Sequence, residues 1–176
     1  MPLNRENIFI IIGGVLVVLL QIILAPYIAI VYATPNFMLA YAVAVAVVRP
    51  NSTRMAVLAF CMGLLYNLLV GGPVGALAVA LILTCMLAGR AMTMLDNGTS
   101  FMPLTILALA VLVTELLYGF MMCLSTGISL GDAMLFRAAP CFIYDAVLGL
   151  VMYFIMKRLA AEPDGTISLG GPTLLR

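Results

Sequence analysis

Histidine and tryptophan are absent from this chain of 176 residues, and charged residues are scarce. Only 9% of the residues are Asp, Glu, Lys or Arg, whereas 65% are hydrophobic. A water-soluble domain of this size needs many more polar side chains to cover its surface, so the composition excludes one. Membrane lipid must therefore surround most of the chain, and we expect an all-α integral membrane protein.

The same absences exclude most kinds of chemistry. Histidine, the commonest side chain for metal binding and for proton transfer near neutral pH, is missing. The 4 cysteines stand singly in apolar stretches, without the paired spacing of a zinc site. The sequence also has no nucleophile motif and no Gly-rich phosphate loop. From these absences we expect no enzyme activity, no metal and no cofactor. The net charge of only +1 gives no reason to expect a nucleic-acid partner.

Six apolar segments stand out, and proline residues fall mainly between them. The segments are 8–25, 36–48, 55–70, 74–89, 102–124 and 138–156. The second, third and fourth are shorter than the ~20 residues that cross a bilayer of ~30 Å. Either their helices extend into the flanking residues or the bilayer thins around them. We predict a six-helix transmembrane domain over residues 1–158 and a flexible cytoplasmic tail over 159–176.

Positive charges are distributed unevenly between the two sides of the predicted membrane domain. With six membrane-spanning helices, both termini lie on the same side. That side carries every one of the 8 Lys and Arg residues except Arg137. Because cytoplasmic loops of membrane proteins are enriched in Lys and Arg, we predict that both termini face the cytoplasm.

Small residues recur at every fourth position in the third and fourth segments. The two stripes are Ala59, Gly63 and Asn67 in the third segment and Gly72, Ala76, Ala80, Thr84 and Ala88 in the fourth. Residues four apart share a helix face, and small side chains let helices approach closely in lipid. The turn Gly71-Gly72-Pro73 is too short to let the two helices separate. We therefore expect an antiparallel hairpin whose stripes contact each other or face a third helix.

Asn67 is the only amide side chain in the third segment. It follows Gly63 by one helical turn, so its side chain would face protein and not lipid. One interpretation is structural: an interhelical hydrogen bond, which stabilises a membrane protein by about 0.6–2 kcal/mol. The other interpretation is a contact with a partner or a ligand.

Two acidic residues lie inside apolar segments, Glu115 in the fifth and Asp145 in the sixth. Each is followed four residues later by a glycine, Gly119 or Gly149, which lets a neighbouring backbone approach the same face. A carboxyl group at membrane depth is costly and normally faces protein or water. If the two segments pack together, the groups would meet, and one would hold a proton. We interpret them as a structural or partner-binding network, with a transport site or an enzymatic acid–base pair as alternatives.

The predicted site combines these features. Its polar or partner-contacting residues are Asn67, Gly71, Gly72, Pro73, Glu115 and Asp145. The small residues of the two stripes, together with Gly119 and Gly149, are expected to pack the helices around them.

Four stretches carry a resemblance to a known family. They are TPNFMLAYAVAVAV at the second segment, MGLLYNLLVGGPVG at the hairpin, VTELLYGF in the fifth segment and MYFIMKRL at the end of the sixth. In this order the chain resembles the rod shape-determining protein family MreD over about residues 8–159. It departs from the family where the hairpin has Asn67 in place of the usual Asp and the last segment has Asp145. If the acid has been exchanged between neighbouring helices, these two residues should be in contact.

The resemblance implies a non-enzymatic, multi-pass protein of the bacterial inner membrane that takes part in cell-wall elongation. The implied partners are an MreC-type periplasmic coiled-coil protein, an MreB-type actin homologue and a RodA-type synthase with its penicillin-binding partner. The implied fold is similar to the substrate-binding subunits of energy-coupling-factor transporters, which gives an alternative function as a vitamin-binding subunit. The outer loops are short and poor in aromatic and hydrogen-bonding residues, which argues against tight capture of a polar vitamin.

Overall fold

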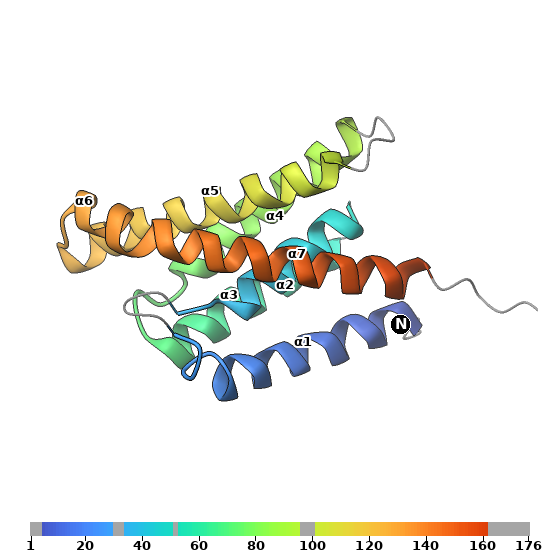
Figure 1. Cartoon of the computed structure of the whole chain (residues 1–176), viewed down its shortest axis with the longest axis horizontal. Helices are drawn as coiled ribbons and strands as arrows, with labels where there is room; N and C mark the ends of the chain where they lie inside the picture. Colours follow the sequence, from blue (N-terminus) through green and yellow to red (C-terminus); the bar gives the residue numbers. More distant parts are fainter. Residues whose placement is uncertain (1–4, 30–33, 51–52, 96–100, 162–176) are drawn as a thin grey trace, which may run out of the picture.

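The structure is a computed structural model that describes residues 5–29, 34–50, 53–95 and 101–161. Within these residues, six long helices form a bundle (Figure 1). They are α1 (Arg5–Ile23), α2 (Phe37–Val48), α3 (Thr53–Val70), α4 (Ala76–Met94), α5 (Phe101–Thr126) and α7 (Ala139–Ala161). A short helix, α6 (Leu130–Asp132), and a π-helical segment, η1 (Ala133–Ala138), lead into α7. The predicted all-α class and the six apolar helices are confirmed.

Several helices extend beyond the apolar segments that predicted them. α4 continues to Met94, past the expected end at residue 89, because Arg90 and Thr93 interrupt the apolar pattern without interrupting the helix. α7 continues to Ala161, so the first three residues of the predicted tail, 159–161, are helical. The remainder of that tail lies outside the described residues.

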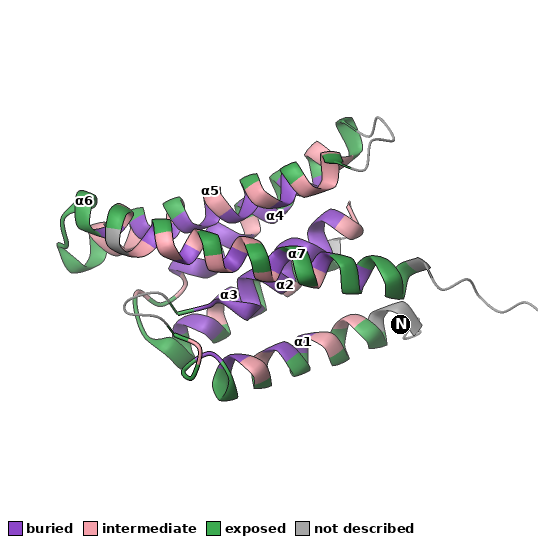
Figure 2. Ribbon diagram, in the orientation of Figure 1, coloured by how far each residue is buried: buried purple, intermediate pink, exposed green. Residues whose placement is uncertain are grey.

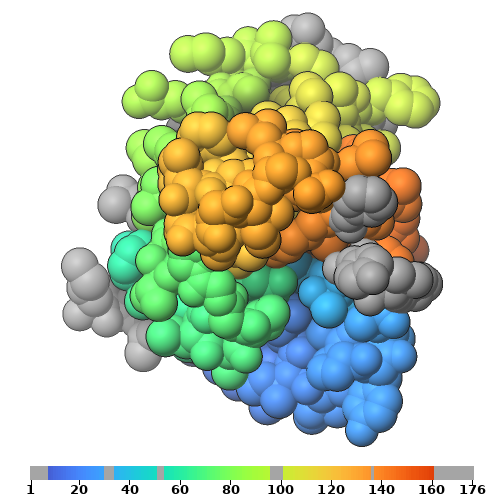
Figure 3. Space-filling view, turned by 90° about the vertical axis from the view of Figure 1, so that its left-hand side faces the viewer, coloured from blue at the N-terminus to red at the C-terminus, as the bar shows by residue number. Residues whose placement is uncertain are grey.

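The two ends of the bundle differ in the segments that they contain. The start of α1 and the end of α7 lie at one end, which we call the terminal end, and the α3–α4 turn and α6 lie at the opposite end (Figure 1). Figure 3 looks onto this second end, the α6 end. Arg54, Arg90 and Lys157 stand in helix turns near the terminal end, whereas Arg137 in η1 lies toward the α6 end. The uneven distribution of Lys and Arg along the sequence therefore places most of the positive charge at the terminal end of the bundle.

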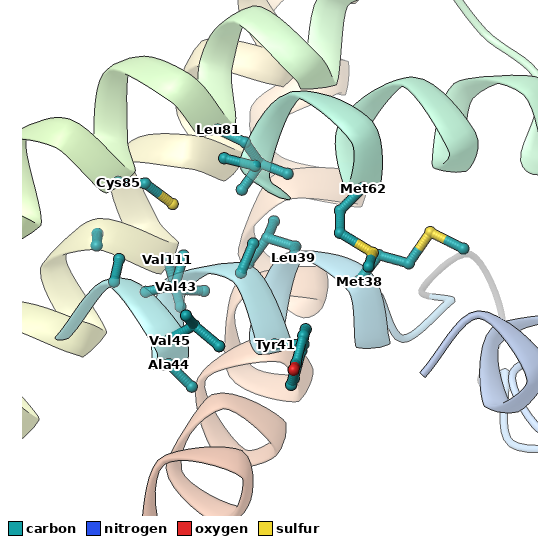
Figure 4. Packing of buried hydrophobic residues seen from close by; sticks show 14 of the residues in the cluster. Met38, Leu39, Tyr41, Val43, Ala44, Val45, Met62, Leu81, Cys85 and Val111 are labelled. Carbon is teal, nitrogen blue, oxygen red and sulfur yellow. The ribbon is translucent and has the colours of Figure 1, made fainter. Parts of the chain in front are cut away.

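α2 is the central helix. It contacts α1, α3, α4, α5 and α7, and each residue from Phe37 to Val47 is buried (Figure 2). Its side chains Met38, Leu39 and Val43 point into a core that also holds side chains from α3, α4 and α5 (Figure 4). A helix that is apolar on all sides is normally surrounded by other elements, and α2 follows this rule.

The length of α2 explains one of the short apolar segments. Its 12 residues rise about 18 Å, which is less than the ~30 Å of a bilayer core. α2 does not extend into its flanks, as one expectation had it. Other helices surround it, and its N-terminus meets side chains of α1 and α7. Among the described residues, α4, α5 and the continuous stretch Leu130–Ala160 are long and apolar enough to cross a membrane alone.

Candidate functional site

The buried N-terminus of α2 is held by three polar side chains. Oδ1 of Asn36 accepts a hydrogen bond from the N–H of Leu39 at 2.9 Å, which makes Asn36 the N-cap of the helix. Oε1 of Gln21 in α1 accepts from the N–H of Phe37 at 2.8 Å, and Oδ1 of Asp145 in α7 accepts from the N–H of Asn36 at 2.7 Å. The first N–H groups of a helix have no partner within it, and lipid offers none. These bonds therefore supply what the enclosed helix end requires.

Asp145 is well suited to this position. It is completely buried, and it is placed at the end of α2 where the helix dipole is positive. Because Asp145 belongs to α7, the contact also joins the last helix of the bundle to its central helix. Sequence analysis located this acid inside the membrane segment but did not identify the helix end that it caps.

Asn67 performs the same task for α4. Its Oδ1 accepts a hydrogen bond from the N–H of Leu77 at 3.1 Å, and its Nδ2 donates to the hydroxyl of Tyr118 in α5 at 3.3 Å. The N-cap position of α4 is Gly75, which has no side chain with which to cap the helix. A side chain from α3 replaces the missing cap, so the amide faces protein and links three helices.

The turn between α3 and α4 brings this cap into place. Gly71, Gly72 and Gly75 have φ values of 89°, 108° and 86°, a region that side chains other than glycine rarely adopt. Gly72 is also close to α5, since a Cβ added to it would lie 2.9 Å from the hydroxyl oxygen of Tyr118. Pro73 follows in the same turn and is half-buried. These three residues with positive φ let the chain reverse direction within the five residues that connect α3 to α4.

The small residues of α3 pack against the backbone of α4. A Cβ added to Gly63 would lie 2.5 Å from the nitrogen of Ala78 and 2.8 Å from the carbonyl carbon of Leu77. No side chain fits in that space, so only glycine permits this approach. Ala59, one turn earlier, is completely buried in the core.

The later part of the α4 stripe, at Thr84 and Ala88, faces α5. The hydroxyl oxygens of Thr84 and of Thr114 in α5 lie 2.8 Å apart and share a hydrogen bond. Ala88 and Ala110 line a groove of about 200 Å³ between the same two helices. Ala76 and Ala80 are buried as well. Of the two arrangements that the sequence left open, the later part of the α4 stripe faces a third helix, whereas Gly63 meets the backbone of Leu77 and Ala78, which do not belong to that stripe.

The two glycines that follow the acids also lie at helix contacts. A Cβ added to Gly149 in α7 would lie 3.1 Å from Cδ2 of Leu107 in α5. One added to Gly119 in α5 would lie 3.5 Å from Cε of Met134 in η1, which is an ordinary contact distance. Gly149 is thus the tighter of the two contacts.

The carboxyl groups of Glu115 and Asp145 meet between α5 and α7. Glu115 is 2% exposed and Asp145 is 0% exposed, and the two carboxyl groups interact with each other. The second oxygens of both groups, Oε2 and Oδ2, are buried and accept no hydrogen bond from the described residues. The structure thus places the two acids of the sequence in one site.

Arg137 and two tyrosines complete the cluster. The guanidinium of Arg137 lies over the ring of Tyr118, 4.4 Å from its centroid, within the range of a cation–π contact. Tyr118 packs edge-on against Tyr66 of α3, with 6.4 Å between the ring centroids. Arg137 also interacts electrostatically with Glu115, so its positive charge stabilises negative charge on the carboxyl pair. η1 carries this arginine, in keeping with the frequent occurrence of π-helical turns at functional sites.

The predicted contact between Asn67 and Asp145 is not among the hydrogen bonds of the described residues. Asn67 bonds to α4 and to Tyr118, whereas Asp145 bonds to the N–H of Asn36. Each of the two side chains caps a different helix, and a side chain that is committed to one helix end is not available to the other. The link between them runs through the intervening side chains of α5 and η1.

Sequence analysis missed several members of this network. Gln21, Tyr66, Tyr118 and Arg137 were not predicted as site residues, although all four contact the network. Gln21 gave a usable signal, because it is a lone amide in an apolar segment, as Asn67 is. Asn36 gave another, since an Asn directly before an apolar run is typical of a helix N-cap.

Comparison with known families gives one match. The family model described as rod shape-determining protein MreD matches residues 5–162, which includes all six long helices. Neither a curated protein nor a solved structure matched the chain. The expected likeness to energy-coupling-factor transporter subunits therefore has no support from a solved structure.

Proposed function

The chain belongs to the MreD family of rod shape-determining proteins, and we propose that it acts as a membrane scaffold of the cell-wall elongation machinery. The family match over residues 5–162 is the observation that carries this proposal. In this role the protein binds an MreC-type periplasmic protein, an MreB-type actin homologue and a RodA-type synthase with its penicillin-binding partner. It lies in the bacterial inner membrane with both termini in the cytoplasm.

The buried polar network supports a scaffolding role because it fixes the helices relative to one another. Gln21 joins α1 to α2, Asp145 joins α7 to α2, and Asn67 joins α3 to α4 and α5. In lipid, apolar burial does not drive helix association, so such bonds and close packing determine the arrangement. A scaffold must present the same surface to its partners at all times. These bonds keep the helices that form the surface in fixed relative positions.

The outward faces of the bundle suit lateral contacts within the membrane. On α1, the side chains of Ile11, Ile12, Val15 and Leu16 are more than half exposed. A groove of about 370 Å³ between α1 and α3 is lined by apolar side chains. Partner helices that lie alongside such faces are held by packing, which is the mode of contact that we propose for this protein.

The two grooves found among the described residues do not favour the alternative function, binding a vitamin for an energy-coupling-factor transporter. A pocket for a polar small molecule needs several hydrogen-bonding groups that converge on a cavity. The grooves between α1 and α3 and between α4 and α5 are lined by apolar side chains apart from Thr84. The Thr84 hydroxyl already bonds to Thr114.

Complementation in rod-shaped cells tests the proposal. Cells depleted of their own copy should become round, and the wild-type chain should restore the rod. We expect Asp145→Ala to fail, because it removes the acceptor at the N-terminus of α2. Val147→Ala, two residues away on the outward face of the same helix, should restore the rod. Cells that stay rod-shaped on depletion contradict the proposal, and rods restored by Asp145→Ala and Glu115→Ala alike remove these acids from its site.

Reporter fusions test the proposed orientation. Green fluorescent protein folds to a fluorescent state in the cytoplasm, and alkaline phosphatase becomes active outside it. A fusion after residue 176 should therefore be fluorescent, and a phosphatase fusion after Ser129, between α5 and α6, should be active. The reverse pattern, with an inactive phosphatase at Ser129 and an active one after residue 176, contradicts the proposed orientation.

A further inference from the structure

The groove between α1 and α3 exists because α1 packs mainly against α2 and stands apart from α3. Its floor is formed by Gly14 and Met62, which are both buried, and a Cβ added to Gly14 would lie 2.7 Å from Cε of Met62. Its walls are apolar, and they include Ile11, Val15 and Leu19 of α1 and Leu58 and Leu65 of α3. Because these side chains offer no hydrogen bond, the part of an occupant that lies in the groove must be a hydrocarbon.

The length of the groove distinguishes a lipid tail from a partner helix. Along α1 the groove extends from Ile10 to Leu19, a rise of about 14 Å. A helix that crosses the membrane needs the full ~30 Å of the hydrocarbon core, whereas the tail of a lipid fills one leaflet, which is about 15 Å deep. The groove therefore has the length of a lipid tail.

Arg54 places a positive charge at the end of the groove that is nearer to the terminal end of the bundle. It precedes Leu58 by four residues, so the two side chains share one face of α3. Arg54 is exposed, and among the described residues it has no acidic partner. α3 begins at Thr53, so the N–H groups of its first turn, which have no partner within the helix, lie beside this arginine. An arginine and a helix N-terminus are both favourable contacts for a phosphate group.

A phospholipid combines the two features that this site requires, a hydrocarbon tail and a phosphate at one end of it. We propose that the groove between α1 and α3 binds one acyl chain of an anionic phospholipid, whose phosphate contacts Arg54 and the N-terminus of α3. Anionic lipids are attracted to arginine residues at the membrane surface, which gives the site its preference over uncharged lipids.

The lipid site and the proposed partner contacts use different faces of α1. Ile12 and Leu16 are 59% and 56% exposed, and neither side chain lines the groove. A tail in the groove leaves this outer face open to partner helices. The lipid site does not rest on the proposed function, because its argument uses only the groove and Arg54.

Native mass spectrometry of the full chain tests the preference for an anionic lipid. The protein would be released from nanodiscs made of phosphatidylglycerol and phosphatidylcholine in equal amounts and with the same acyl chains. The wild-type protein should retain phosphatidylglycerol in preference. Arg54→Ala should lower the ratio of retained phosphatidylglycerol to phosphatidylcholine about fivefold, the effect of one arginine near an anionic lipid. Arg90→Ala removes an exposed arginine of α4 that lies outside the groove and should leave the ratio unchanged. Equal retention of the two lipids by the wild type, or an equal loss in both variants, overturns the proposal.

Fluorescence quenching tests the location of the lipid. The chain has no tryptophan, so a single introduced tryptophan reports on its own surroundings. Val15→Trp would place it in the groove wall, and Leu16→Trp would place it on the outer face at nearly the same depth. Phosphatidylglycerol with brominated tails, as a minor component of phosphatidylcholine bilayers, should quench Val15→Trp more strongly than Leu16→Trp. Equal quenching of the two overturns the proposal, even if Arg54→Ala does not fold.

A partner helix is the competing occupant of the groove. A photo-activated cross-linker at Val15 of the chain in native membranes should become joined to lipid. Cross-linking at this position to another protein, without lipid, would overturn the lipid site. That result would leave the scaffolding role intact, because the role is tested separately by complementation.

Discussion

Gly63→Ala is the change whose effect follows most directly from the structure. The added Cβ would lie 2.5 Å from the backbone nitrogen of Ala78. Ordinary van der Waals contact begins at 3.4 Å, so α3 and α4 must separate by about 0.9 Å at this point. The obstacle is backbone, which cannot rotate away as the end of a flexible side chain can.

This separation also strains the cap of α4. The bond from the N–H of Leu77 to Oδ1 of Asn67 is 3.1 Å long and joins the same two helices one turn away, so moving α3 away from α4 weakens it. Overpacking costs about 1–3 kcal/mol, and a lost interhelical hydrogen bond costs about 0.6–2 kcal/mol. If both costs are incurred, Gly63→Ala should lower the free energy of unfolding by about 2–5 kcal/mol.

Equilibrium unfolding in mixed micelles with increasing SDS measures this loss. Gly131→Ala is the matched control, because a Cβ added to Gly131 meets nothing within 4 Å. Ala78→Gly supplies a second control: it removes only a methyl group, so it should not rescue Gly63→Ala if the backbone is the obstacle. The reasoning is refuted if Gly63→Ala is as stable as Gly131→Ala, or if Ala78→Gly restores its stability.

Two further predictions concern the α3–α4 turn and use the same unfolding assay. Asn67→Ala should cost about 1 kcal/mol because it leaves a backbone N–H of α4 without its cap, whereas Asn67→Asp keeps an acceptor and should stay closer to wild type; equal losses would contradict the capping role. Gly72→Ala should destabilise more than Gly71→Ala, because both have positive φ but only a Cβ at Gly72 meets Tyr118; a larger loss at Gly71 would contradict this.

The helices themselves could be predicted from the sequence because hydrophobicity marks them. In lipid, a continuous apolar run is sufficient to identify a helix, and each of the six runs corresponds to one. The ends of α4 could not be located in this way, since Arg90 and Thr93 are compatible with a helix that leaves the apolar layer. The enclosure of α2 was equally hidden, because an apolar run has the same appearance whether lipid or protein surrounds it.

The residue types of the site were predictable, but their partners were not. Asn67, Glu115 and Asp145 are conspicuous as polar residues in apolar segments, and all three are buried. Which helix end each one satisfies depends on distances across the bundle, and Asp145 lies 109 residues from the Asn36 N–H that it accepts from. Sequence patterns relate residues three or four positions apart and carry no information over such a separation. The sequence could therefore not show whether Asn67 and Asp145 are in contact.

The most direct test of the central proposal is recovery of partners from native membranes. The tagged chain would be extracted in a gentle detergent, and co-purifying proteins would be identified by mass spectrometry, with Val147→Ala as the control for the variant Asp145→Ala. The proposal predicts a single-span coiled-coil protein together with a cell-wall synthase, both depleted in the Asp145→Ala sample. Recovery of paired ATP-binding subunits with a transmembrane coupling protein would contradict it and identify the chain as a transporter subunit.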